Sequence, residues 1–212
     1  ISPSRTAFDY VIAGVEINNK TILLDATSKF SQPNILPIRD LNWIGRLIRK
    51  DKTSNEINLM PEINSKDIIN LMAEIKSNGE VSGKIRDQYF DYNAFSYREN
   101  YNALSDETIV EKIEKKYQDV EISEYAVLNK TDLTKPIVES YSFSTTDEVE
   151  IIGDKMYFSP LLFFALTENP FKQETRLYPL DFVYPTQDKY SVTIKIPDGY
   201  IVETLPTSKS VG

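Results

Sequence analysis

The sequence predicts a β-rich α+β fold with one main helix, and three observations support this prediction. Short runs of β-branched and aromatic residues recur along the chain, separated by residues that form turns. The 13 tyrosines and 10 phenylalanines are typical of strands and sheet faces. A helical pattern of apolar residues occurs near residues 106–117. With 41% hydrophobic residues, this chain of 212 residues can bury the core of one large or two small domains.

The first predicted hairpin covers Phe8 to Thr27, where two apolar stretches flank a pair of asparagines. Asparagine tolerates the left-handed backbone that a tight hairpin turn requires. If the asparagines form a two-residue loop, Ile17 pairs with Lys20. Tyr10 and Asp25 then lie on one face of the sheet as diagonal neighbours, about 7–8 Å apart at the backbone. A shift of one residue in this register would break the arrangement.

Two further hairpins are expected downstream. They comprise residues 44–49 with 56–60, and residues 68–75 with 81–89. Asn78-Gly79 in the last pair is the strongest hairpin signal in the chain. Pro61 to Lys66 is polar and begins with a proline, and the hydrophobic pattern restarts after it. We therefore place a domain boundary here, between residues 1–60 and 61–212.

The main helix is expected near residues 106–117, after a segment at 91–103 that is helical at least in part. Ser105 is a good N-cap, and the two acidic residues after it suit the positive end of the helix dipole. Residues 161–166 predict either a buried strand or a helical turn. The other expected strands are residues 120–128, 136–144, 148–158 (with a turn at Gly153-Asp154), 175–185, 190–196 and 200–205, with a turn at Pro197-Asp198-Gly199.

Two phrases of the first hairpin, FDYV at residues 8–11 and LDAT at residues 24–27, carry a family resemblance. They resemble the strands that hold the catalytic His and Asp of a bacterial transglutaminase-like (papain-like) domain. The resemblance places Tyr10 at the family's His position and Asp25 at its Asp position, with the nucleophilic Cys upstream. The phrase LPIRDLNWIGRLIR at residues 36–49 resembles the segment that follows the Asp strand.

Phrases near the other end of the chain, NPF, RLYPLDFVYP and IPDGYIVETLP, extend the resemblance. They are similar to the β domain that follows the transglutaminase-like domain in large secreted or lipoprotein-type proteins of Bacteroidetes. The resemblance implies the end of a transglutaminase-like sheet in residues 1–60 and a β-sandwich-like domain in residues 61–212. It also implies an extracytoplasmic location: periplasmic, cell-surface or secreted. The opening Ile1-Ser2-Pro3-Ser4 predicts a fragment or a processed product.

The chain contains no cysteine and no histidine, so it cannot perform Cys–His chemistry by itself. A tyrosine, with an ordinary pKa near 10, is a poor base at neutral pH. We therefore expect a non-catalytic structural or interaction module, in which Tyr10 and Asp25 pack or form hydrogen bonds within the hairpin. Two alternatives stay open. Asp25 could belong to a thiol acyl-transferase or peptidase whose Cys lies upstream, with Tyr10 or another residue as its proton partner, or the chain could be a carbohydrate-binding module.

Composition excludes several other classes of function. The formal net charge of −8 argues against binding to nucleic acid or anionic membranes. Without Cys and His, a zinc or non-haem iron site is not expected, and no cofactor or metal is predicted. No apolar run approaches the ~20 residues of a membrane helix, so direct membrane insertion is not expected. Protein or glycan partners remain open, and exposed strands at Phe8–Ala26 could pair edge to edge in a dimer.

Two other groups of residues are candidates for binding. The aromatic residues in 89–101 could form a sugar-stacking or peptide-binding surface, or could pack in the core, and the same holds for Tyr178, Phe182 and Tyr184. Carboxylates that a glycosidase would need as a pair are also plentiful. These are Asp87 with Asp91, Glu148 with Glu150, and Glu139 elsewhere. Spacing alone does not show which of them meet.

Overall fold

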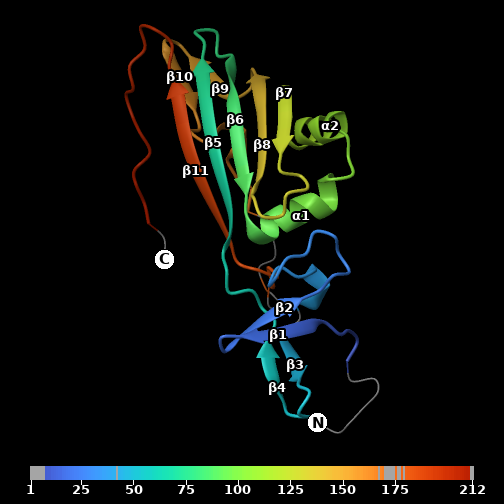
Figure 1. The fold of residues 1–212 in the computed structure, drawn as a ribbon. Helices are drawn as coiled ribbons and strands as arrows, with labels where there is room; N and C mark the ends of the chain where they lie inside the picture. The colour runs from blue at the N-terminus through green and yellow to red at the C-terminus, as the bar shows by residue number, and fades with distance from the viewer. Residues whose placement is uncertain are drawn as a thin grey trace.

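The centre of the computed structural model is a five-stranded sheet in the order β11-β5-β6-β8-β7 (Figure 1). The structure describes residues 8–41, 43–166, 168–169, 175, 178 and 180–210. The strands are β5 (Ser65–Ile75), β6 (Val81–Tyr89), β7 (Val120–Leu128), β8 (Ile137–Thr145) and β11 (Thr186–Lys195). β11 runs parallel to β5, whereas all other neighbours in this sheet are antiparallel. The predicted β-rich α+β class is therefore confirmed.

One face of this sheet is covered. The covering elements are α1 (Asp91–Tyr101), α2 (Asp106–Lys116), the 3-10 helix η2 (Leu162–Phe164), and a hairpin of β9 (Val149–Ile152) and β10 (Lys155–Phe158). Alternate residues of the central strands, such as Leu71, Ile85 and Phe143, are buried against them. The opposite face carries exposed polar residues such as Lys84. A face that is largely polar and exposed needs no covering layer of its own.

A β-sandwich-like domain was predicted, and the described residues differ from it. The layer that faces the five-stranded sheet consists of helices and a two-stranded hairpin, not of a second large sheet. The segment at 91–103 accounts for part of this difference, because it forms a complete second helix, α1. α2 occupies the segment where the main helix was expected, and the Ser105 hydroxyl accepts a hydrogen bond from the Thr108 amide at 3.3 Å, as an N-cap does.

The N-terminal part contains two separate hairpins, drawn in blue to cyan in Figure 1. Their elements are β1 (Ala13–Ile17), β2 (Lys20–Leu24), β3 (Ile44–Ile48) and β4 (Ser54–Asn58), with the 3-10 helix η1 (Ile38–Asp40) between the hairpins. Ile17 pairs with Lys20, and the asparagines of the loop have φ of 50° and 61°, so the predicted register of the first hairpin is confirmed. Buried Leu36 and Phe30 pack with Tyr92 of α1 in one apolar cluster, which therefore crosses the predicted boundary after residue 60.

Three predictions for the last third of the chain meet different outcomes. Residues 161–166 contain a helical turn, η2, and not a buried strand. The described residues of 175–185 form no strand, and the strand expected at 190–196 begins earlier, at Thr186. The strand expected at 200–205 is wrong: residues 200–205 form no strand, and 201–205 are exposed. An alternating pattern becomes a strand only beside an available edge, and the turn at 197–199 directs the chain away from the edge of β11 (Figure 1).

Within the described residues, no helix combines the length and the apolar character that crossing a membrane requires.

Candidate functional site

The structure places Tyr10 and Asp25 in direct contact. The Tyr10 hydroxyl donates a hydrogen bond to Asp25 Oδ2 at 2.9 Å and lies 3.0 Å from the Thr27 hydroxyl. The Thr27 amide donates to Asp25 Oδ1 at 2.7 Å, and Arg39 Nη2 donates to the Tyr10 hydroxyl at 3.0 Å. The register of β1 and β2 explains this meeting, since it carries both residues to the same end of the hairpin.

Asp25 is held as a carboxylate inside this network. Burial acts to raise its pKa, but the hydrogen bonds that it accepts from Thr27 and Tyr10 contribute to an opposite shift that outweighs burial and lowers the pKa to about 2. The neighbouring Asp40 shows the opposite shift, because burial and its contact with Asp25 raise its pKa to about 6. Tyr10 therefore acts as a donor that fixes Asp25, which is compatible with a purely structural role. The catalytic roles that the resemblance implies for Tyr10 and Asp25 stay predictions.

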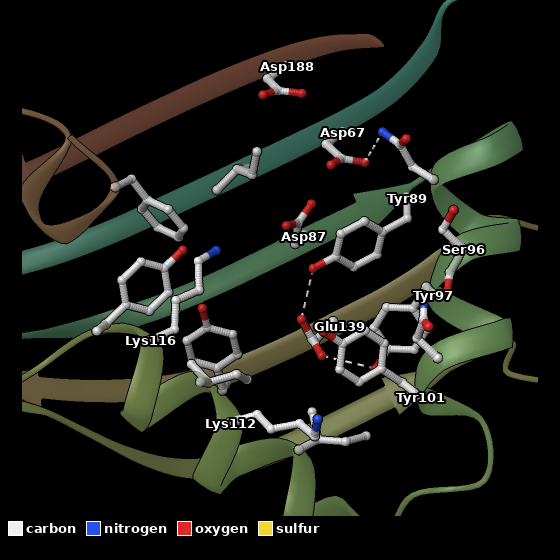
Figure 2. A pocket seen from close by; sticks show the side chains of 18 of the residues that line it. Asp67, Asp87, Tyr89, Ser96, Tyr97, Tyr101, Lys112, Lys116, Glu139 and Asp188 are labelled. Carbon is white, nitrogen blue, oxygen red and sulfur yellow. Dashed lines mark hydrogen bonds between the residues drawn. The ribbon is translucent and has the colours of Figure 1, made fainter. Parts of the chain in front are cut away.

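A second site lies between the covered face of the large sheet and the helices α1 and α2 (Figure 2). It is a cavity of about 450 Å³, a size typical of sites that take small ligands. Tyrosines and carboxylates dominate its lining, with Asn93 and Ser96 from α1 on one side and Lys112 and Lys116 from α2 on another. Both helices thus form the wall that faces the sheet.

Four neighbouring strands each supply one carboxylate to this cavity: Asp188 from β11, Asp67 from β5, Asp87 from β6 and Glu139 from β8. Asp188 is the register partner of Asp67, and Asp87 is the register partner of Glu139. Register partners on one face have Cβ atoms about 5 Å apart, so these acids form a row across the sheet. Figure 2 shows the row in the order Asp188, Asp67, Asp87 and Glu139.

Glu139 is fully engaged by tyrosines. Its Oε1 accepts hydrogen bonds from Tyr125 at 2.6 Å and from Tyr97 at 3.0 Å, and its Oε2 accepts one from Tyr89 at 2.9 Å. Burial, followed by the negative charge of Glu139, raises the pKa of all three phenols. The tyrosines therefore remain protonated donors, and both oxygens of Glu139 are occupied.

Asp67 and Asp87 are less well satisfied. Burial raises the pKa of Asp67 to about 6, although Asn93 donates a hydrogen bond to it at 2.9 Å. Burial and the charges of Asp67 and Glu139 raise the pKa of Asp87 to about 7, although Tyr89 acts to lower this pKa. Asp87 is 9% exposed, and its Oδ1 is a buried oxygen without a hydrogen-bond partner in the described part of the chain. A buried polar atom without a partner is rare and requires an explanation.

No lysine or arginine neutralises this row in the residues that the structure describes. Every ion pair found there involves other carboxylates. The two lysines of the cavity are exposed, and each lies near an aromatic ring instead: Lys112 Nζ is 5.9 Å from the ring centre of Tyr101, and Lys116 Nζ is 4.6 Å from that of Tyr117. Nor do the described residues include a group of three or more acidic side chains placed to hold a metal ion.

The cavity unites some of the predicted binding residues and leaves others out. Asp87 and Glu139 line it together with tyrosines 89, 97 and 101 from the predicted aromatic segment. Tyr184 also lines it and stacks on Tyr92 with ring centres 4.9 Å apart. The residues that do not line it are Asp91, Glu148, Glu150, Tyr178 and Phe182.

Asp67 and Asp188 were not predicted as site residues, although the sequence contains a signal for each of them. Asp67 precedes Ile69 and Leu71 in an alternating series whose apolar members face the core. An acid in the apolar phase of a strand is a candidate buried carboxylate. Asp188 carries the same kind of signal, because it precedes Tyr190, Val192 and Ile194 in an alternating series whose apolar members pack against the core.

Comparison with known families gives one match. Residues 154–212 match a family described as a domain of unknown function with a solved structure, DUF3858. The match begins at the turn before β10 and includes η2 and β11, so it contributes Asp188, Tyr184 and Phe164 to the cavity. No curated protein and no solved structure matches the chain.

Proposed function

We propose that this chain is a non-catalytic interaction module that binds a small ligand, or one side chain of a partner, in the cavity between the large sheet and the helices α1 and α2. The buried, unpartnered carboxylate of Asp87 inside a 450 Å³ cavity is the observation that supports this proposal. Convergent polar groups and perturbed pKa values in a concave site are typical of binding sites. The tyrosine lining provides planar surfaces against which a ligand can pack.

The arrangement favours binding over glycoside hydrolysis. A glycosidase requires one carboxylic acid and one free carboxylate that can serve as nucleophile or base. Asp87 has the raised pKa of a proton donor. Its partner Glu139, however, has both oxygens occupied by tyrosine hydroxyls, so it is poorly placed to attack a sugar or to activate water. The absence of Cys and His from the sequence also argues for a non-catalytic role.

Within this proposal, residues 8–27 are the last hairpin of a transglutaminase-like sheet, and the chain is the C-terminal region of an extracytoplasmic protein of that kind. The FDYV and LDAT phrases and the contact between Tyr10 and Asp25 support this assignment. The partner would be a protein or a glycan. A dimer through an outer edge of the two-stranded hairpin of β1 and β2 is a subsidiary proposal, which solution scattering of a monomer at high concentration would contradict.

A screen by NMR tests the proposed binding site. The chain, with labelled tyrosines, is titrated with a panel of sugars, amino acids, amines and capped peptides. We expect at least one class to shift the tyrosine signals of the cavity. The variant Asn100→Trp, which fills the mouth of the cavity, should abolish these shifts. Ala103→Trp is the matched control, because Ala103 is exposed just beyond the end of α1 and does not line the cavity.

Two results would overturn the proposal. One is a panel in which no compound shifts the cavity tyrosines at millimolar concentration. The other is a set of hits that Asn100→Trp leaves unchanged, since those compounds would bind elsewhere on the surface.

The second candidate function is a part of a thiol acyl-transferase or peptidase. The observation that favours it is the ionised Asp25, which holds a hydrogen-bond donor at the position where the resemblance places the catalytic base. In a longer parent protein, iodoacetamide should then label an upstream cysteine, and Asp25→Asn should slow the labelling. An inert or absent cysteine would remove this candidate.

A further inference from the structure

No ion pair to a lysine or arginine neutralises the row of acids within the described residues, and its members differ in burial: Glu139 and Asp87 are buried, Asp67 is partly buried and Asp188 is exposed. Buried carboxylates are normally paired with a cation or fully hydrogen-bonded, because burial removes their hydration. Glu139 meets this requirement through its three tyrosines. Asp67 has a single neutral donor, Asn93, and Asp87 Oδ1 has none in the described residues. The site is thus satisfied at the Glu139 end and deficient in donors and positive charge around Asp67 and Asp87.

The lysines at the rim do not correct this deficit. Lys112 and Lys116 lie on α2 and approach the rings of Tyr101 and Tyr117, not the carboxylates (Figure 2). Their exposed amino groups are free to face an acceptor on a ligand, such as a carbonyl or carboxylate oxygen. The cavity therefore presents acceptors on the sheet side and donors on the α2 side.

The aromatic wall beside the acids indicates the kind of cation. Tyr89, Tyr97 and Tyr101 form a continuous series, with ring centres 5.1 Å apart at each step. Tyrosine faces attract organic cations, and the attraction grows when the cation is desolvated. A metal ion is less suitable, because the described residues offer no group of three ligands for it.

We propose that the cavity binds an organic cation, a primary ammonium or guanidinium group, with its charged head at Asp87 and Asp67 and its stem along the tyrosine wall. The proposal rests on the proposed function, because it names the class of ligand for the same site. Acceptor groups at the other end of the ligand then meet Lys112 and Lys116. The ligand is either a small free amine or guanidine, or the side chain of a lysine or arginine in a peptide, since these share one recognition chemistry.

Calorimetric titration of the folded chain tests this inference. The cationic probes are butylamine, butylguanidine, and the acetylated and amidated forms of lysine and arginine. The neutral probes are the acetylated and amidated forms of norleucine and citrulline, which keep the length of the stem. We expect the charged probes to bind about tenfold more tightly, or better, than their neutral counterparts, because a hydrogen bond to a charged partner is stronger than a neutral one.

Asp87→Asn should weaken binding of the cationic probes about tenfold or more, since it keeps the shape of the side chain and removes its charge. Glu150→Gln is the matched control, because Glu150 is an exposed strand carboxylate outside the cavity, and it should change nothing. Circular dichroism verifies that both variants fold. If Asp87→Asn does not fold, the affinities of charged and neutral probes for the unsubstituted chain still show whether the cavity prefers a cation.

Each outcome has a distinct meaning. Tight binding of butylamine or butylguanidine supports the inference with a free amine as the ligand, whereas binding of the capped amino acids alone supports it with a peptide as the source. If neutral probes bind as tightly as charged ones while Asn100→Trp blocks both, the inference is overturned and the binding function stands. If no compound binds, both are overturned.

Discussion

Replacing Asp87 with asparagine should stabilise the protein at alkaline pH and leave its stability nearly unchanged at acid pH. Burial and the charges of Asp67 and Glu139 raise the pKa of Asp87 from 3.8 to about 7. The folded state therefore holds this proton more tightly than the unfolded chain does. The stability that the proton confers is complete below about pH 4 and is lost as the pH rises through about 7. Asparagine does not ionise, so the variant avoids this loss.

The structure sets the size of the effect. A rise in pKa from 3.8 to about 7 corresponds to about 4 kcal/mol of unfolding free energy between pH 4 and pH 8. The substitution recovers less than this, because Asp67 ionises over an overlapping range and contributes part of the shift. We expect Asp87→Asn to be about 2 kcal/mol more stable than the unsubstituted chain at pH 8.5, and about equal to it at pH 4.5.

Charged and titratable groups from every element around Asp87 line the same cavity. They are Asp67 on β5, Tyr89 on β6, Glu139 and Tyr141 on β8, Asp188 and Tyr190 on β11, Tyr97 and Tyr101 on α1, and Lys112, Lys116 and Tyr117 at α2. Comparison of the variant with the unsubstituted chain cancels the contributions that the two proteins share. The difference between their curves therefore reports on Asp87.

Urea denaturation followed by circular dichroism, at half-unit steps from pH 4.5 to 8.5, measures the effect. Glu150→Gln serves again as the control, because it removes an exposed carboxylate from a strand edge of another hairpin. If the pKa of Asp87 is raised as described, the difference in stability between Asp87→Asn and the unsubstituted chain widens as the pH rises. A gap that is constant with pH, or a variant that is less stable at pH 8.5, would refute it.

Two further predictions concern the scaffold. Gly83→Ala should destabilise the protein by about 2 kcal/mol or more in urea denaturation. The reason is that an added Cβ would clash with the carbonyl oxygen of Met72 on the neighbouring strand. A variant as stable as the unsubstituted chain would contradict this close approach. Arg98→Met should cost about 3 kcal/mol or more, because the buried guanidinium donates to four backbone carbonyls in the loop 129–135 between β7 and β8. Hydrogen exchange should then accelerate in that loop, and unchanged exchange there would be evidence against this role.

Local signals in the sequence were sufficient for the hairpins and the capped helix. The two asparagines after Ile17 fix a two-residue loop, and that loop determines which residues pair along the hairpin. The contact between Tyr10 and Asp25 follows from this register alone. Ser105 marks the start of α2 by the same kind of short-range chemistry. In each case the residues that decide the structure lie within a few positions of one another.

The composition of the cavity could not be predicted, because it depends on pairing between distant strands. Asp67 and Asp188 become neighbours only because β11 returns to run parallel to β5, and nothing local specifies that pairing. The strand expected at 200–205 failed for a related reason, because the turn at 197–199 directs these residues away from the open edge of β11 (Figure 1). The β-sandwich-like domain was implied by the family resemblance, whereas helices α1 and α2 take part in covering the apolar face of the sheet.

The position of Asp87 in its strand carries one further implication. Val81, Ile85 and Asp87 share one face of β6, and the first two are core residues. An apolar residue at position 87 would continue this pattern and remove a buried oxygen that has no partner. Binding sites often hold a residue that lowers the stability of the free protein, where an apolar residue would raise it. Such a residue is poorly solvated and poorly paired without its ligand. It therefore gains the most interaction energy when a ligand of opposite charge binds. If Asp87→Asn raises stability above pH 7 and also weakens binding of cations, the same desolvation accounts for both effects.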